Sequence, residues 1–216
     1  MSRLPVVATS FAFAATLMLG LAAPADAQVG KSLGIVNPNV ASDSVLHSLP
    51  HVTPAIAKSL VEKRPFARMR DVNVVVRASL DSAKAAALYG RMFLPIDLND
   101  FADEEVLLIP RVGKRMLHEF HEYQPYAALA QWHREIDKYV DDAELARLEQ
   151  YVYVRLDLNT ASDADILTIP GVGKRMLHEF KEYRPWVSLA QFQREIGKYV
   201  DKKELARLQR YVRLAK

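Results

Sequence analysis

Apolar residues along this chain recur every three or four positions, which is the spacing of one buried face of an α-helix. The pattern is clearest in three segments near the C-terminus, with the apolar sets Met176, Leu177 and Phe180, then Leu189, Phe192 and Ile196, then Leu205, Leu208 and Val212. A shorter helical segment before them begins at a polar cap, Thr160 or Ser162. No stretch shows sustained strand alternation. The pattern therefore predicts an all-α protein of short helices.

The helical pattern is repeated with a period of sixty residues. Residues 96–155 and 156–215 align without a gap and are identical at more than half of their positions, while residues 36–95 fit the same register more loosely. All three copies keep an asparagine, a proline and an aromatic residue in register: Asn39, Asn99 and Asn159; Pro65, Pro125 and Pro185; Phe66, Tyr126 and Trp186. We therefore expect three tandem repeats of four helices, at residues 36–95, 96–155 and 156–216. Large apolar residues such as Trp186, Phe192 and Tyr211 are expected in their cores.

The first 27 residues differ from the rest of the chain. Arg3 is followed by an apolar run from Leu4 to Ala23, and the segment ends in the small-residue sequence Ala25-Asp26-Ala27. This is the pattern of a secretory signal peptide with cleavage after Ala27, so residues 28–35 become a linker to the first repeat. We expect a secreted or periplasmic protein. The alternative is an uncleaved membrane anchor, since the apolar run is long, and only then would the protein be held at a membrane.

A short glycine turn stands between the first two helices of the third repeat, in "IPGVGKR" (residues 169–175). Gly171 allows a turn with positive φ, where a side chain would collide with the backbone. Gly173 then leaves the first amides of the next helix uncovered, and those amides attract an anion such as a phosphate. Lys174 and Arg175 add positive charge beside them.

This unit resembles the helix-hairpin-helix motif, and with "DLNTAS" before it and "YRPW" after it the third repeat resembles the DNA-binding domain of the ComEA family (SAM/ComEA-like repeats). The resemblance implies non-specific binding of DNA through its phosphate backbone, in the setting of DNA uptake. The residues expected to bind phosphate are Gly171, Val172, Gly173, Lys174 and Arg175 in the third repeat, and Gly113, Lys114 and Arg115 in the second.

The other two repeats depart from the motif in different degrees. Arg111 replaces the first glycine of the second repeat, which implies either backbone strain or an added cation beside the phosphate. His51 and Thr53 replace both glycines of the first repeat, where Thr53 with the following proline reads as an ordinary helix cap. We therefore expect the first repeat to keep the fold without the phosphate site.

A second hairpin, usual in domains of the ComEA type, is also missing. Residues 137–148 and 197–208 occupy its place and lack the paired glycines. Net charge differs between repeats: the first carries +4 and the third +4, while the second carries −6 with 13 acidic against 7 basic residues. The expected basic surface belongs to the third repeat and consists of Lys181, Arg184, Arg194, Lys198, Lys202 and Lys203.

These departures keep a second function open, a protein-interaction or scaffold module in an envelope complex that binds no DNA. The extrinsic lumenal subunit of photosystem II resembles the same hairpin unit and serves a protein assembly. His118 and His121 lie three residues apart beside acidic residues, but the spacing is not that of a zinc protease, and we expect a solvated helix face. Neither a catalytic arrangement nor a small-molecule, cofactor or metal site is indicated, so we expect a non-enzymatic protein.

Overall fold

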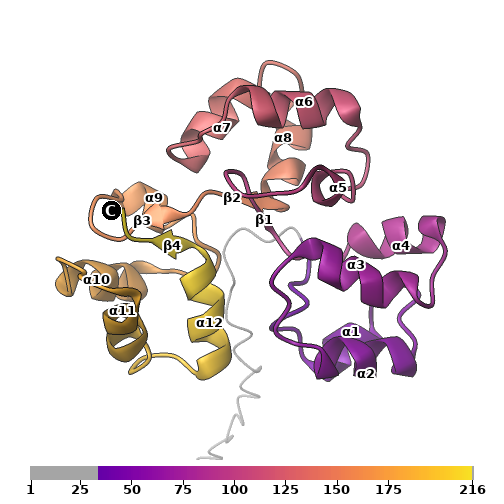
Figure 1. Cartoon of the computed structure of the whole chain (residues 1–216), viewed down its shortest axis with the longest axis horizontal. Coiled ribbons are helices and arrows are strands. Elements are labelled where there is room, and N and C mark those ends of the chain that lie inside the picture. The colour runs from indigo at the N-terminus through magenta and orange to yellow at the C-terminus, as the bar shows by residue number, and fades with distance from the viewer. Residues whose placement is uncertain (1–33, 216) are drawn as a thin grey trace, which may run out of the picture.

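The computed structural model describes residues 34–215, which form twelve helices and four two-residue strands, and the expected all-α character is confirmed. The predicted signal peptide and most of the predicted linker lie outside the described residues. Helices are grouped in three lobes around a common centre (Figure 1), and each lobe falls within one sixty-residue unit. We call residues 36–95, 96–155 and 156–215 the first, second and third repeats.

Each repeat contributes four helices in the same order. The first contains α1 (Asp43–His47), α2 (Pro54–Glu62), α3 (Met69–Arg77) and α4 (Ser82–Tyr89). The second contains β1 (Ile96–Asp97), α5 (Asp103–Val106), α6 (Lys114–Glu122), α7 (Leu129–Ile136), α8 (Asp142–Glu149) and β2 (Val152–Tyr153). The third contains β3 (Leu156–Asp157), α9 (Asp163–Ile166), α10 (Lys174–Glu182), α11 (Leu189–Ile196), α12 (Lys202–Arg210) and β4 (Val212–Arg213).

Four short strands accompany the helices and were not expected from the sequence. β1 pairs in parallel with β2, and β3 with β4, while Val36 and Met92 make a single equivalent bridge in the first repeat. Two-residue strands are too short to show alternation along the chain, and they form because the end of each repeat returns beside its beginning. Each repeat is thereby closed, and the next one begins directly after it.

The shared asparagine ties the start of each repeat to its aromatic residue. In the third repeat the Asn159 side-chain oxygen accepts from the Trp186 amide at 2.7 Å, and its nitrogen donates to the Trp186 carbonyl at 2.9 Å. Asn39 with Phe66 and Asn99 with Tyr126 make the same pair of bonds. The preceding peptide bonds, Arg64–Pro65, Gln124–Pro125 and Arg184–Pro185, are all cis. The asparagine is therefore a structural residue that satisfies both polar groups of one peptide segment.

Within residues 34–215, the buried apolar side chains form two clusters rather than three. One spans the first and second repeats together, with Trp132, Tyr126, Tyr151 and Phe93 among its largest buried side chains. The other lies within the third repeat, apart from Tyr153 at the end of β2. Trp186, Phe192 and Tyr211 belong to this second cluster and are at most 4 % exposed, so their predicted core positions are confirmed.

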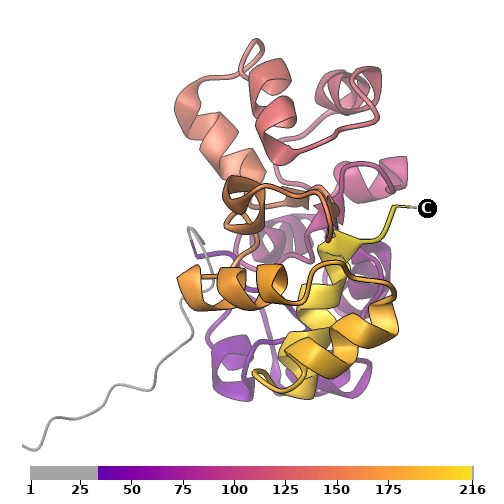
Figure 2. The ribbon, with the colours of Figure 1, turned by 90° about the vertical axis from the view of Figure 1, so that its left-hand side faces the viewer.

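Arginines connect the three repeats at the centre of the molecule. Asp100 of the second repeat is paired with Arg68 of the first at 2.6 Å and with Arg155 at 2.8 Å. Arg210, at the end of α12, donates to the carbonyls of Ala67 and Pro95 at 2.8 and 3.2 Å, which joins the third repeat to the first. Figure 2 looks onto the third repeat, with the second above it and the first behind. A cavity of about 180 Å³ lies between these side chains.

We expect Asp100→Asn to weaken the junction in a pH-dependent way. The hydrogen bond from Arg68, followed by the charges of Arg68 and Arg155, lowers the pKa of Asp100 below its ordinary value of 3.8. A lowered carboxyl pKa gives stability that is complete above 3.8 and is lost as the pH falls through the folded-state pKa. Because Asp100 is half exposed, the loss at pH 7 should be only about 0.5–1 kcal/mol. Urea unfolding at pH 7 and pH 3 should show a difference between wild type and variant that shrinks on acidification, and an equal difference at both values would contradict this role.

Candidate nucleic-acid interface

The turn between the first two helices has the same backbone conformation in all three repeats. Gly171 has φ 80°, as predicted, and Arg111 and His51 have φ 67° and 62° although both carry side chains. The left-handed region is unfavourable for residues other than glycine. The strain considered for Arg111 is therefore present, and the first repeat keeps the turn as well as the helix start.

The helix that follows the turn is capped differently in the first repeat. The Thr53 hydroxyl accepts a hydrogen bond from the Ile56 amide at 3.3 Å, so the N-terminus of α2 is capped by a side chain of the protein. Gly113 and Gly173 begin α6 and α10 and offer no side-chain cap. In the third repeat the remaining three helices are each capped by their own side chain, from Ser162, Ser188 and Asp201. The first amides of α6 and α10 are thus left for an external acceptor.

Gly173 occupies a place where the fold itself does not require glycine. Its φ of −103° is open to any residue, and a Cβ built there would meet no protein atom within 4 Å. The same is true of Gly113, with φ −118°. Both glycines are exposed, as are Lys174 and Arg175 directly after Gly173. A side chain at either position would cover the helix start, so these glycines preserve access for something outside the chain.

Val172 differs from the other predicted site residues. Its side chain is 7 % exposed within the core of the third repeat, and its amide donates to the Ile169 carbonyl at 3.0 Å. The amide is therefore used inside the turn and is not free for a phosphate. Val172 positions the hairpin, while the predicted contacts of Gly173, Lys174 and Arg175 lie together on the exposed side.

We expect the two glycines of this turn to respond differently to alanine. Gly171→Ala places a side chain at φ 80° and should lower the free energy of unfolding by about 1 kcal/mol. Gly173→Ala should leave stability within about 0.5 kcal/mol of wild type, because its backbone and surroundings accept a methyl group. Thermal and urea unfolding of the two variants provide the measurement, each serving as the control for the other. Equal losses would show that Gly173 has a structural role.

Arg111 of the second repeat is directed toward α8. Its guanidinium is paired with Glu144, which also binds Arg147. These arginines, Arg147 first, lower the pKa of Glu144, so the carboxylate stays charged. Arg111, which the sequence suggested as an added cation beside a phosphate, is thus paired with a carboxylate of the protein itself.

Most of the predicted basic surface is also engaged. Lys181 pairs with Asp163 at 2.7 Å, Arg184 donates to the carbonyls of Leu158 and Ala161, and Arg194 and Lys198 both bind Glu195. Lys202 and Lys203 are exposed in the first turn of α12. The six side chains therefore do not form the single free basic surface that the sequence suggested.

Carboxylates cap the helices at the place of the missing second hairpin. Asp81, Asp141 and Asp201 accept from the amides of Lys84, Glu144 and Glu204 at 2.9, 2.8 and 2.8 Å. A negative charge at these helix starts opposes binding of a phosphate there. Sequence reasoning noted the absent glycines but missed the acidic caps, which an aspartate directly before each fourth helix could have indicated.

The two histidines of α6, His118 and His121, contact different partners. His121 approaches Asp103 at 2.8 Å and packs against the Phe101 ring, whereas His118 lies 3.6 Å from Glu122 along the same helix. Within residues 34–215 there is no group of three or more potential metal-binding side chains. The contact of His121 with α5 corresponds to that of Lys181 with Asp163 in the third repeat, a pairing that the sequence analysis did not find.

Comparison of the chain with protein-family models, curated proteins and solved structures found no match. Among the residues that the structure describes, none of the helices has the length and apolar character needed to cross a membrane.

Proposed function

We propose that this is a non-enzymatic helix-hairpin-helix protein, similar to the ComEA family, that binds DNA through its phosphate backbone without sequence preference. The observation that carries the proposal is the start of α10, which has no side-chain cap and is opened by a glycine that the fold does not need. Lys174 and Arg175 are exposed beside it. Uncapped amides together with adjacent cations suit a phosphate oxygen.

The same reasoning ranks the three repeats. The third, residues 156–216, carries the best site, with a glycine at both turn positions. The second, residues 96–155, offers Gly113, Lys114 and Arg115 but has a net charge of −6, which repels a polyanion. The first, residues 36–95, has its own Thr53 cap and serves as scaffold. With one good site and one weakened site, we expect weak, salt-sensitive binding.

The proposal includes export of the protein from the cytoplasm. A signal peptide over residues 1–27, cleaved after Ala27, would place the repeats outside the cytoplasm, as a secreted or periplasmic protein. Incoming DNA would be a suitable ligand there, which agrees with a role in DNA uptake.

A second candidate function is a scaffold or protein-interaction module in an envelope complex. It is favoured by the carboxylate caps at Asp81, Asp141 and Asp201 and by the acidic second repeat, since neither suits DNA. Under this alternative the hairpins would maintain the fold of each repeat and bind no nucleic acid.

The deciding experiment is a mobility shift of duplex DNA with the purified protein at about 50 mM and 200 mM salt. DNA binding predicts a shift at low salt that weakens strongly at the higher concentration and is equal for unrelated sequences. No shift at low salt would refute it. Recovery of partner proteins from an envelope fraction after nuclease treatment would then favour the scaffold alternative.

A further inference from the structure

One position faces the next repeat in the first two repeats but is exposed in the third. It is the first residue of the third helix, occupied by Met69, Leu129 and Leu189. Met69 is 1 % exposed and Leu129 is 7 % exposed, whereas Leu189 is 37 % exposed. The four preceding residues have the same burial class in all three repeats, so the difference begins at this position.

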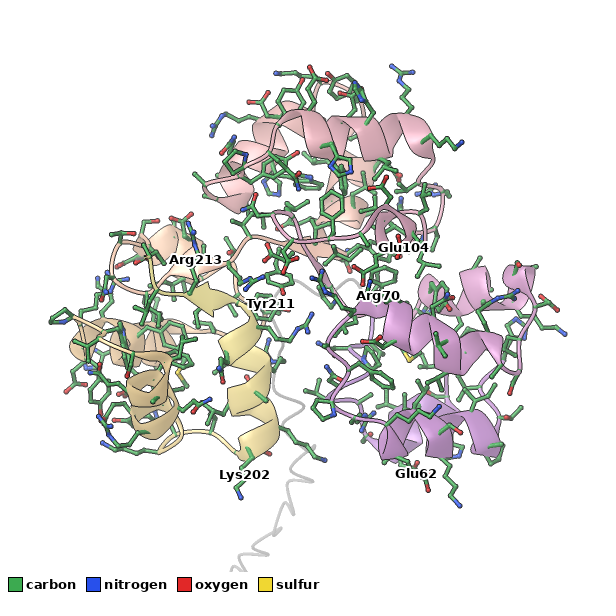
Figure 3. All side chains as sticks on the ribbon, viewed as in Figure 1. Glu62, Arg70, Glu104, Lys202, Tyr211 and Arg213 are labelled. Carbon is green, nitrogen blue, oxygen red and sulfur yellow. The ribbon has the colours of Figure 1, made fainter. Side chains whose placement is uncertain are left out.

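The following repeat lies against this position in both internal cases. Met69 lines the central cavity with Asp100 and Glu105 of the second repeat. Beside it, the Arg70 guanidinium lies 4.0 Å from the Glu104 carboxylate, and Figure 3 shows the two side chains facing each other across the junction. Leu129 likewise lines a cavity of about 210 Å³ together with Ala164 and Leu167 of the third repeat. The third helix of one repeat therefore meets the first helix of the next.

Residues 34–215 contain no fourth repeat to cover Leu189. The surrounding surface is also more apolar than in the other repeats, because Val187 stands where Ala67 and Ala127 stand, and Val187 is 80 % exposed. We call Val187 and Leu189 the α11 end face. Leu189 stands at the position that is buried at both internal junctions, and the exposed Val187 adds to the apolar surface beside it in the chain.

The opposite end of the repeat series offers the matching surface. No repeat precedes α1 within the described residues, and its Ser44 and Val45 stand where Glu104 and Glu105 stand on α5 and where Ala164 and Asp165 stand on α9. Ser44 is exposed and Val45 is half-buried. Ser188 and Ala190, which flank Leu189, are uncharged, as are Ala128 and Ala130 around Leu129. Leu189 is thus flanked by uncharged residues, and Ser44 and Val45 are uncharged as well, while Asp43 beside them on α1 is an exposed carboxylate.

We propose that the α11 end face of one molecule binds the first helix, α1, of a second copy of this chain. The contact continues the packing that joins successive repeats, with Leu189 in the role of Met69 and Leu129. Because the two surfaces are at different ends of the series, the association is head-to-tail rather than two-fold symmetric. It does not depend on DNA binding. A single small contact gives weak association that increases with protein concentration.

Sedimentation equilibrium over a range of concentrations tests the proposal. The average mass of the wild-type protein should rise above that of one copy, 24.4 kDa for all 216 residues, as concentration increases. Leu189→Asp and Val187→Asp should each remain monomeric, with unchanged circular dichroism, since both side chains are exposed. Val74→Asp is the matched control: Val74 is 67 % exposed but lies on α3, and the variant should associate like wild type. A monomeric wild type at all concentrations overturns the proposal, as does association that Leu189→Asp leaves intact.

A mixing experiment distinguishes head-to-tail association from symmetric pairing of two α11 end faces. Ser44→Arg blocks the α1 surface with a long charged side chain that neither internal junction has at this position, and Leu189→Asp blocks the α11 end face, so neither variant alone should associate. A mixture retains one intact surface of each kind and should yield a one-to-one heterodimer that does not extend further. Self-association of Ser44→Arg alone, or no heterodimer in the mixture, would overturn the head-to-tail contact.

Discussion

Replacing Lys174 and Arg175 together with glutamate is expected to abolish the low-salt mobility shift of duplex DNA, with a loss of affinity of roughly tenfold to a hundredfold. Both side chains are exposed in the first turn of α10, beside the amides that Gly173 leaves open. The reversal puts two negative charges where a phosphate would lie. The fold should not suffer, because acidic residues are favourable in the first turn of a helix.

Lys202 and Lys203 provide the matched control for this prediction. They are exposed in the first turn of α12, so Lys202→Glu with Lys203→Glu changes the net charge by the same amount at a helix that Asp201 already caps. We expect this variant to bind with only a modest loss. Equal losses for the two double variants would mean that overall charge, and not the hairpin, governs DNA binding.

The second large effect concerns stability and is expected for Asn159→Ala. Its side chain makes two hydrogen bonds, at 2.7 and 2.9 Å, to the amide and carbonyl of Trp186, which is itself 2 % exposed. Alanine leaves both backbone groups without their side-chain partner, while the exposed position of Asn159 lets water replace part of what is lost. The free energy of unfolding should fall by about 2 kcal/mol, measured by urea denaturation. Because the third repeat has its own apolar cluster, fluorescence of Trp186, followed in a Trp132→Phe background, should report this loss.

Two substitutions nearby separate the role of the hydrogen bonds from that of the loop. Asn159→Asp keeps the acceptor for the Trp186 amide and loses the donor to its carbonyl, so its effect should lie between wild type and Asn159→Ala. Thr160→Ala, at an exposed neighbour, should change stability by less than about 0.5 kcal/mol. If Asn159→Ala were as mild as Thr160→Ala, the asparagine would not have the structural role assigned to it.

Several features of the fold followed directly from residue pattern. The period of apolar residues predicted short helices throughout, and Trp186, Phe192 and Tyr211 lie in a core as expected. Gly171 predicted a positive φ, and the structure has 80°. These are local consequences of helical periodicity and of the missing side chain of glycine, which is why they can be recognised without knowing what packs against them.

Other features depended on contacts between residues far apart in the chain. No residue pattern indicated that Arg111 would reach Glu144, or that Arg210 would bind the Ala67 carbonyl. Charge counting therefore overstated the free positive charge, because it could not show which cations have partners. The parallel strand pairs were missed for the same reason, since two residues form a strand only when the other end of the repeat lies beside them.

The helical class, the sixty-residue period and the place of each glycine turn could be recognised from residue order, because short-range spacing and backbone freedom depend on neighbouring residues. Tertiary structure alone decided which of the predicted cations are engaged within the protein, as Arg111 is with Glu144 and Lys181 is with Asp163. It also decided that Leu189 is exposed where Met69 and Leu129 are covered, because burial depends on which repeat packs against each face and not on the residue itself.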